Sequence, residues 1–567
     1  MHRRTIRALR SVSCRYASSS IPKKNYDAIV IGGGHNGLVA AFYLAKAGKN
    51  VCVLERRHIV GGAAVTEEII PGFKFSRASY VLGLLRPKVY YDLDLKRHGL
   101  KVYSRDPSSY TPLHENYWKN NKGKSLTLGP HEDQNSQQIA QFSEKDAKSM
   151  VLLENHLMRC AEAIAPLLDQ VPPDVGRFVN SSAWNKLKQI GTFTPFMKMA
   201  STMGKDLPQF YELMSAPAIK ILDSWLESEP LKCTLATDSV IGAMISPSTP
   251  GSGYVLLHHV MAQYGGLGSW GYPEGGMGGV TEAMARAASE VGADIFVNQP
   301  VKSILLGTKD EAVGVETEEG NYIYAKTILS NATADTTFLK LLPSGSLPKE
   351  YEASIKALNY TSPVCKINVA LKALPNFKAN PNVGENTIMP HHRCTIHLNC
   401  EKTELLEEAY MQAIHGRIPD NPMIELTIPS SCDPTLAPSG CHVALFFTQY
   451  VPYSGDDGRP WSEDLKKEYA KKVFSTVDEY APGFTDSIIG YEVLPPPELE
   501  KIFGLTGGNI FHGAMSLDQL LISRPSSLQP SPFTPISGLL LCGAGAHPGG
   551  GVMGAPGRLA ALSALKC

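Results

Sequence analysis

The chain of 567 residues is too long for a single compact core, and its length predicts about two to four domains. Lysine plus arginine and aspartate plus glutamate balance at 54 each, so the composition does not predict a nucleic-acid partner. No apolar run is long enough to cross a bilayer, and we expect a protein that is soluble or at most peripheral to a membrane.

Residues 1–25 differ in composition from the rest of the chain. They contain five arginines and several serines, and no acidic residue precedes Asp27. This composition is typical of a mitochondrial transit peptide, and a disordered basic tail is the alternative. The eleven cysteines include no C-x-x-C pair, which favours a reducing compartment over a secreted disulfide framework. We therefore expect a mitochondrial protein, in the matrix or on the matrix face of the inner membrane.

The segment from residue 26 onwards begins with a βαβ unit. A short apolar strand over 27–32 ends in a glycine turn, a helix follows over about 36–46, and a second strand covers 51–55. Such a unit is the usual start of a doubly wound parallel sheet.

Further along, helical and mixed segments alternate. Residues 144–244 show apolar positions at helical spacing, whereas residues 271–331 return to a glycine-rich turn, a helix and short strands. Residues 362–510 read as strands plus a helix over 463–480, for which Ser462 is a suitable N-cap. The last fifty residues contain a strand, a glycine-rich loop and a helix.

The turn after the first strand carries the motif G-x-G-x-x-G, and Ile31 precedes it. The motif residues are Gly32, Gly33, Gly34, His35, Asn36 and Gly37. Gly32 permits the tight turn, Gly34 leaves room for a pyrophosphate, and Gly37 allows the helix and strand to approach closely. Free amide groups and the positive end of the helix dipole then face the phosphates. The strand–turn–helix context favours a dinucleotide site over a chance glycine-rich turn.

Residues after the second strand indicate which dinucleotide is bound. Glu55 lies 18 residues beyond the motif, where a carboxylate accepts hydrogen bonds from both ribose hydroxyls and disfavours a 2′-phosphate. Gly61 and Gly62 would let a loop pass close to the phosphates and sugar chain, which favours FAD. Arg56 and Arg57 could each neutralise phosphate, and a solvated surface charge is the alternative for either one.

The glycine-rich loop near the C-terminus again connects a buried strand to a helix. We expect this loop to hold the flavin end of the cofactor, with the helix dipole stabilising negative charge on the flavin. His547 is the best polar candidate for a catalytic residue there, and a structural turn residue is the alternative. The candidate cofactor contacts of the loop are Gly543, Gly545, Gly549, Val552 and Met553.

Three motifs give the chain a resemblance to a known family. They are G-x-G-x-x-G with E-x5-G-G, then Y-P-x-G-G-M at residues 272–277, and L-x-G-x-G-x-H-P-G-x-G near the C-terminus. The sequence resembles the phytoene desaturase and carotenoid isomerase branch of the flavin amine oxidase-like superfamily. The resemblance implies non-covalent FAD, a backbone contact from Val301 to the adenine, and a flavin lined by Gly545, Gly549 and Val552. The chain departs from the desaturases at Ala63 of the cofactor loop, where they commonly have an arginine that contacts the cofactor.

Other chemistries have less support in the sequence. No cysteine lies between Cys52 and Cys160, so the close pair that a flavin disulfide reductase needs is missing, and no second GxGxxG unit for NAD(P)H is found. Histidines and cysteines crowd positions 391–400, but they meet no recognised zinc spacing and we expect no metal.

Residues 182–199 combine large apolar side chains with lysines. They could form a helix that rests on a membrane at the mouth of an apolar substrate tunnel. Packing in the core under a cap is the interpretation we favour, and Gly191 and Pro195 interrupt the helix.

Together these patterns predict an α/β fold, with a Rossmann-type (glutathione-reductase-like) FAD-binding domain and an inserted α+β substrate domain. We expect the first to comprise residues 26–105, 262–345 and 511–567, and the second to comprise residues 106–261 and 346–510. The predicted function is hydride transfer between flavin N5 and a hydrophobic organic substrate, as in a desaturase or isomerase. A flavin amine oxidase and a non-catalytic, FAD-stabilised mitochondrial binding protein are the alternatives.

Overall fold

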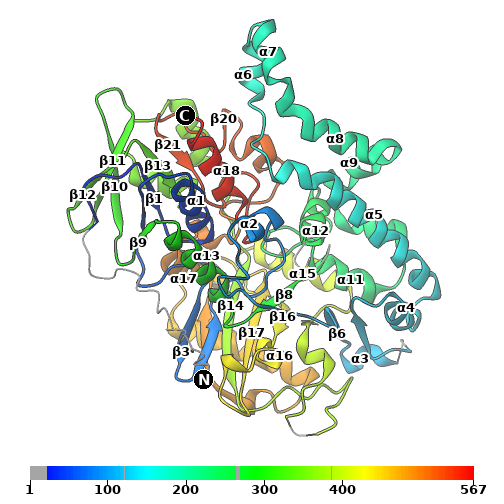
Figure 1. Cartoon of the computed structure of the whole chain (residues 1–567). Helices are drawn as coiled ribbons and strands as arrows, with labels where there is room; N and C mark the ends of the chain where they lie inside the picture. Colours follow the sequence, from blue (N-terminus) through cyan, green and yellow to red (C-terminus); the bar gives the residue numbers. More distant parts are fainter. Residues whose placement is uncertain (1–21, 120–121, 263–267, 385) are drawn as a thin grey trace, which may run out of the picture.

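The computed structural model describes residues 22–119, 122–262, 268–384 and 386–567. Most of the predicted transit peptide therefore lies outside the described residues. Two large sheets form the centres of two parts of the molecule, and a group of helices extends from them (Figure 1). The predicted α/β fold with a Rossmann-type unit is confirmed, while the domain boundaries given above stay a prediction.

A five-stranded parallel sheet forms the first part, in the order β21-β13-β1-β2-β9. Its strands come from three distant stretches of sequence, and nearly all their side chains are buried because both faces are covered. The strand bounds are Ala28–Ile31 (β1), Val51–Leu54 (β2), Asp294–Phe296 (β9), Thr327–Ser330 (β13) and Leu539–Leu541 (β21).

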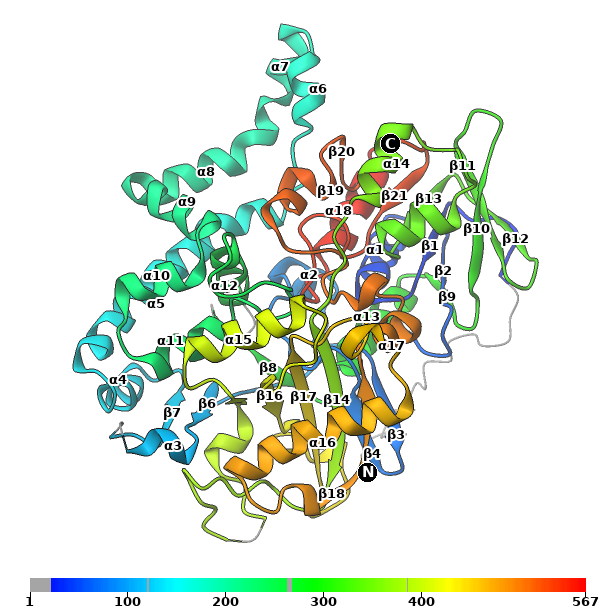
Figure 2. The same ribbon diagram turned by 180° about the vertical axis from the view of Figure 1, so that it is seen from behind.

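The two faces of this sheet pack against different layers. Ala28 and Val30 of β1 pack with the helices α1, α13 and α18, whereas Ile29 and Ile31 pack with the small sheet β10-β11-β12. Helices α1 and α18 lie side by side in both views (Figures 1 and 2). The bounds are His35–Lys46 (α1), Gly278–Glu290 (α13), Ala555–Ala564 (α18), Val301–Leu306 (β10), Ala312–Thr317 (β11) and Tyr322–Tyr324 (β12).

A seven-stranded sheet forms the second part, in the order β18-β14-β17-β16-β15-β6-β7. Neighbouring strands run antiparallel except β15 and β6, which are parallel. The bounds are Ser109–Pro112 (β6), Ser125–Leu128 (β7), Val364–Leu371 (β14), Thr395–Leu398 (β15), Met423–Thr427 (β16), His442–Gln449 (β17) and Ile488–Leu494 (β18).

Helix α16 (Glu463–Tyr480) covers one face of this sheet, over the apolar side chains that alternate along the strands. The prediction for this helix is confirmed, including its N-cap, because the Ser462 hydroxyl accepts a hydrogen bond from the Leu465 amide at 3.2 Å. Every second residue points to the opposite face, which brings Lys366, Glu425 and Phe447 toward the first part of the molecule.

The predicted helical region over 144–244 is confirmed. Helices α8 and α12 pack on α5, whereas α6 and α7 project away from the body (Figures 1 and 2). The bounds are Glu132–Ala140 (α4), Glu144–Leu168 (α5), Val175–Asn180 (α6), Ala183–Gln189 (α7), Thr194–Met203 (α8), Leu207–Ser215 (α9), Ala218–Trp225 (α10), Glu229–Thr237 (α11) and Ser252–Val260 (α12).

Shorter elements connect these layers. They are α2 (Pro87–Asp92), α3 (Glu115–Trp118), α14 (Lys349–Lys356), α15 (Thr403–Ile414), α17 (Pro496–Phe503), β3 (Thr66–Ile70), β4 (Phe73–Ser76), β5 (Val102–Ser104), β8 (Gly271–Pro273), β19 (Pro525–Ser526) and β20 (Gln529–Pro530).

The core interpretation of residues 182–199 is wrong. Trp184 is 67% exposed, Leu187 61% and Ile190 56%, although Phe196 behind them packs on the helical core. The segment splits into short helices, and their outer face has no covering element among the described residues (Figure 1). No helix of the described part is long and apolar enough to span a bilayer.

Candidate active site

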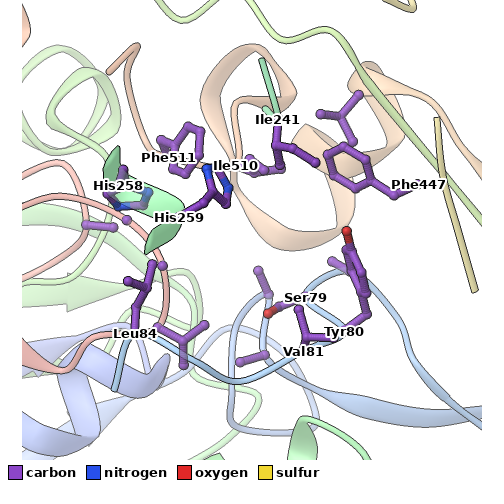
Figure 3. Close-up of a pocket in the computed structure, with 18 of the residues that line it drawn as sticks. Ser79, Tyr80, Val81, Leu84, Ile241, His258, His259, Phe447, Ile510 and Phe511 are labelled. Carbon is purple, nitrogen blue, oxygen red and sulfur yellow. The ribbon is translucent and has the colours of Figure 1, made fainter. Parts of the chain in front are cut away.

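One large cavity of about 1080 Å³ lies between the two parts of the molecule. Its wall combines the loops at the carboxyl ends of the parallel strands with the inner face of the seven-stranded sheet and with α5 and α12. Figure 3 shows Tyr80, His259, Ile241 and Phe447 around the same space. Ligands of open α/β sheets bind at this strand edge, so the cavity is the candidate site.

The β1–α1 turn is shaped by its glycines, as the motif predicts. Gly32 has φ of +93°, which an L side chain rarely adopts. A Cβ on Gly34 would lie 2.8 Å from Asn331 Nδ2, and one on Gly37 would lie 2.2 Å from the Gly32 oxygen. Gly34 therefore keeps the floor of the cavity open, and Gly37 permits close packing of the helix on the strand.

Glu55 lies at the end of β2, where its carboxylate receives two backbone hydrogen bonds. Its Oε2 accepts from the Gly33 amide and its Oε1 from the Arg57 amide, both at 2.8 Å. Burial raises the pKa of Glu55, and these two donors act against that shift. The carboxylate lines the cavity, in the position that the sequence predicts for a ribose contact.

Several buried polar atoms of the cavity wall lack a partner among the described residues. They are His35 Nε2 and Asn36 Oδ1 in the first turn of α1, Arg57 Nη1, both ring nitrogens of His258, and His512 Nδ1. Burial lowers the pKa of His35 to about 4 and that of His512 to about 3, so both rings are neutral at pH 7. Unpaired buried groups are costly, and this set fits a large ligand with phosphates and a polar ring system.

Most of the predicted cofactor residues line this cavity. Those that line it are Ile31, Gly32, Gly34, His35, Asn36, Glu55, Arg56, Gly61, Gly62, Ala63, Val301 and Val552. Those behind the lining are Gly33, Gly37, Gly543, Gly545, Gly549 and Met553, although their neighbours Ala544, Gly550 and Gly551 line it. Gly543 supports the wall instead, since a Cβ there would lie 2.7 Å from the Asn331 oxygen.

The two glycine loops meet in space. A Cβ on Gly557, in the first turn of α18, would lie 2.0 Å from the Asn36 oxygen in the first turn of α1. A Cβ on Gly551 would lie 2.4 Å from Leu84, so this loop also passes close to the opposite wall. The first turns of α1 and α18 are therefore in contact, and residues 550–552 of the loop before α18 line the same cavity as the first turn of α1.

The two neighbouring arginines have different roles. Nη2 of Arg56 donates to two carbonyl oxygens in the last turn of α17, at 3.1 and 2.7 Å, so this residue caps a helix. Arg57 pairs with Glu67 at 2.7 Å and lies 5.2 Å from the Phe503 ring centre, and its Nη1 has no partner. Arg57 is therefore the better candidate for a phosphate contact.

His547 does not face the cavity. Its Nε2 lies 2.8 Å from the Leu167 oxygen and its amide donates to the Ser531 hydroxyl at 2.7 Å. Burial lowers its pKa to about 4. In this structure His547 therefore has the contacts of a structural turn residue.

The sequence reasoning missed Lys366, whose side chain is 1% exposed and lies on the cavity face of β14. Its Nζ donates to Asn368 Oδ1 at 2.9 Å and lies 5.4 Å from the centre of the Tyr80 ring. Burial lowers the pKa of Lys366 to about 7. A lysine inside a largely apolar strand was the signal that could have indicated this residue.

The comparisons with known proteins agree with this site. Residues 30–88 match an NAD(P)-binding Rossmann-like domain, and residues 239–556 match the family described as flavin containing amine oxidoreductase. The second match covers more than half of the chain, and the chain belongs to this family of flavin-dependent oxidoreductases.

Individual relatives support the same relationship. Pyridine nucleotide-disulfide oxidoreductase domain-containing protein 2 of Rattus norvegicus is 51% identical over 562 residues, which are 98% of this chain and 97% of the relative. A chloroplastic prolycopene isomerase of Daucus carota is 30% identical, over 94% of this chain and 78% of the relative, so the predicted link to the carotenoid isomerase branch is confirmed. Putrescine oxidase bound to putrescine shares the fold, with a TM-score of 0.58 at 14% identity over 96% of this chain and 99% of that one.

Proposed function

We propose that the protein is an FAD-dependent oxidoreductase that exchanges a hydride with an apolar organic substrate, in the manner of a desaturase or isomerase. The observation that carries the proposal is the convergence of the two glycine loops, Glu55 and a set of unpaired polar atoms on one cavity. The relatedness to a prolycopene isomerase supports the choice of an apolar substrate.

The cofactor is bound without a covalent link in this proposal. Among the described residues no cysteine lines the cavity. Cys542 at the end of β21 instead packs in the apolar layer formed with α1 and α13. A flavin linked through a cysteine would need that thiol in the cavity.

The bound flavin supplies the hydride acceptor or donor. The chain itself positions the substrate and excludes water, since much of the wall away from the glycine loops is apolar. Lys366 Nζ can hold or release a proton near neutral pH, because burial brings its pKa to about 7. His258 lies beside the glycine loop as a neutral ring, since burial lowers its pKa to about 3.

The test is to purify the protein, denature it with acid and identify the released cofactor by mass. We expect one FAD per chain in the wild type and none in Gly34→Glu, whose side chain would enter the floor of the cavity. Gly191→Glu is the matched control, because no atom lies within 4 Å of its added Cβ. Loss of FAD from both variants, or from neither, would contradict the placement of the cofactor.

We also propose that residues 175–205 dock the protein on an anionic membrane, on the matrix face of the inner mitochondrial membrane. The segment contains five basic residues and no acidic one, beside the exposed Trp184, Leu187 and Ile190. Helix α8 of this segment packs on α5, which lines the cavity, so docking would bring the cavity close to apolar substrates in the bilayer.

Vesicle co-sedimentation tests the docking. We expect binding to vesicles with anionic phospholipid, weaker binding to zwitterionic ones, and loss of binding in Leu187→Glu. Val383→Glu is the control, since Val383 is 82% exposed on a distant loop. Equal binding of all three proteins would refute this surface. For the location, residues 1–25 fused to a fluorescent protein should direct it to mitochondria.

A further inference from the structure

A cluster of polar side chains lies in the cavity on elements outside the five-stranded sheet. The Tyr80 hydroxyl donates to Glu425 Oε2 at 2.6 Å, and His397 Nε2 lies 3.4 Å from Glu425 Oε1. Burial raises the pKa of Glu425, but the hydrogen bonds from His397 and Tyr80 outweigh it and lower the pKa. Both carboxylate oxygens therefore have partners within the protein, and this group fixes the positions of its neighbours.

Three side chains of the same cavity region have a polar atom without a hydrogen-bond partner among the described residues. His397 directs Nε2 at the Glu425 carboxylate, so in the neutral ring its Nδ1 is an acceptor, and Nδ1 is buried without a partner. His259 Nδ1 lies 2.9 Å from the Val255 oxygen, which can only accept, so Nδ1 carries a proton and, in the neutral ring, Nε2 is an acceptor. Asp238 follows α11 and lines the cavity, with no hydrogen bond or ion pair to any described residue.

The two cations near this cluster donate hydrogen bonds to other groups. Arg105 donates to the Thr395 hydroxyl at 2.5 Å and to the Trp270 oxygen at 3.3 Å, and its guanidinium lies 5.7 Å from the Tyr272 ring centre. Lys366 donates to Asn368. Burial raises the pKa of Asp238, as expected for a carboxylate without a direct donor.

Apolar side chains line the cavity between this cluster and the glycine loops. Figure 3 shows Ile241, Phe447, Ile510 and Phe511 directed at the space. The walls therefore suit an apolar body, while one end carries the carboxylate of Asp238, which has no donor among the described residues. Placing a pure hydrocarbon there would leave Asp238 and the two imidazole acceptors without water or donors, which is costly.

We infer that the substrate is amphipathic, with an apolar body whose far end carries a hydrogen-bond donor, a hydroxyl or an ammonium group, bound by Asp238 and His259. This inference rests on the proposed function and narrows its substrate class. The donor satisfies the acceptors and fixes how far the apolar body reaches toward the glycine loops, which sets the carbon atom presented for oxidation.

Binding of three probes with the same chain, 1-octanol, octylamine and octane, tests the inference by calorimetry on the flavin-loaded protein. We expect 1-octanol or octylamine to bind about ten- to a hundredfold more tightly than octane. Asp238→Ala should remove that preference and leave octane binding unchanged. Asp238→Asn keeps an acceptor oxygen without the charge, so it should retain the preference for octanol and lose that for octylamine. Asp223→Ala is the control, since this carboxylate lies on the surface of α10 and pairs with Lys232.

Equal affinities for the three probes in the wild type would overturn the inference, as would a preference that survives in Asp238→Ala. Calorimetry needs no flavin signal, so the probes can also be measured on a colourless preparation. A protein without FAD that still prefers the donor-bearing probes would contradict the proposed function and support the head-group site. A protein that contains FAD but binds the three probes equally would support the proposed function and contradict the head-group site.

Discussion

The contact between α1 and α18 gives a sharp test, through the change Gly557→Ala. A Cβ at this position would lie 2.0 Å from the Asn36 oxygen, far inside contact distance, and the neighbouring atom is backbone. Alanine in a helix is otherwise up to about 1 kcal/mol more favourable than glycine. Overpacking of a rigid contact costs about 1–3 kcal/mol, so we expect a net loss of roughly 1–2 kcal/mol in the free energy of unfolding.

The same change should weaken cofactor binding, because α18 can relieve the clash only by displacing the first turn of α1. Urea unfolding with and without added FAD measures both effects. Gly176→Ala in α6 is the control, since its Cβ meets only Asp174 Oδ1 at an ordinary 3.7 Å, and it should be neutral or slightly stabilising. If Gly557→Ala unfolds at the wild-type urea concentration and keeps its FAD, the two helix N-termini do not meet as described.

Three more substitutions test the site. The wild type should gain stability relative to Lys366→Met as the pH rises from about 7 to 10.5. Over that range the unfolded chain holds the lysine proton and the folded chain does not. A difference in urea midpoint between the two proteins that does not change with pH would contradict the buried amine. Arg57→Leu should weaken FAD binding by about tenfold, whereas Arg56→Leu should lower only thermal stability, and titration of apoprotein with FAD separates the two. Arg524→Leu should cost about 3–5 kcal/mol in unfolding free energy and weaken FAD binding. The guanidinium of Arg524 is fully buried and donates to the Ala544 oxygen at 3.0 and 3.2 Å, beside other carbonyls. A variant as stable as the wild type would show that those carbonyls find other donors.

Local patterns were sufficient to predict the β1–α1 glycine turn and the position of Glu55. The motif from Gly32 to Gly37 has one backbone solution when it follows a buried strand, and Glu55 is positioned by the next parallel strand. The bounds predicted for 463–480 match α16 because an N-cap and a regular apolar stripe agree. Where the glycine motif, the N-cap and the apolar periodicity agree, the local backbone structure can be predicted from the sequence.

The substrate half depends on contacts between distant residues, which one sequence does not show. Arg56 and Arg57 are adjacent, and only the positions of α17 and Glu67 decide which one caps a helix. Asp238 and His259 carry no local signal, since their surroundings come from strands about 140 to 190 residues further on. The prediction that residues 182–199 pack in the core was wrong, because apolar periodicity identifies an apolar face without showing whether another element covers it.

The most direct test of the central claim is hydrogen–deuterium exchange during titration of the apoprotein with FAD. If one cofactor lies across both glycine loops, the amides of the first turn of α1 and those of residues 543–554 should become protected together, with the same midpoint in FAD concentration. Protection of one loop alone, or two separate midpoints, would show that the loops do not share a flavin.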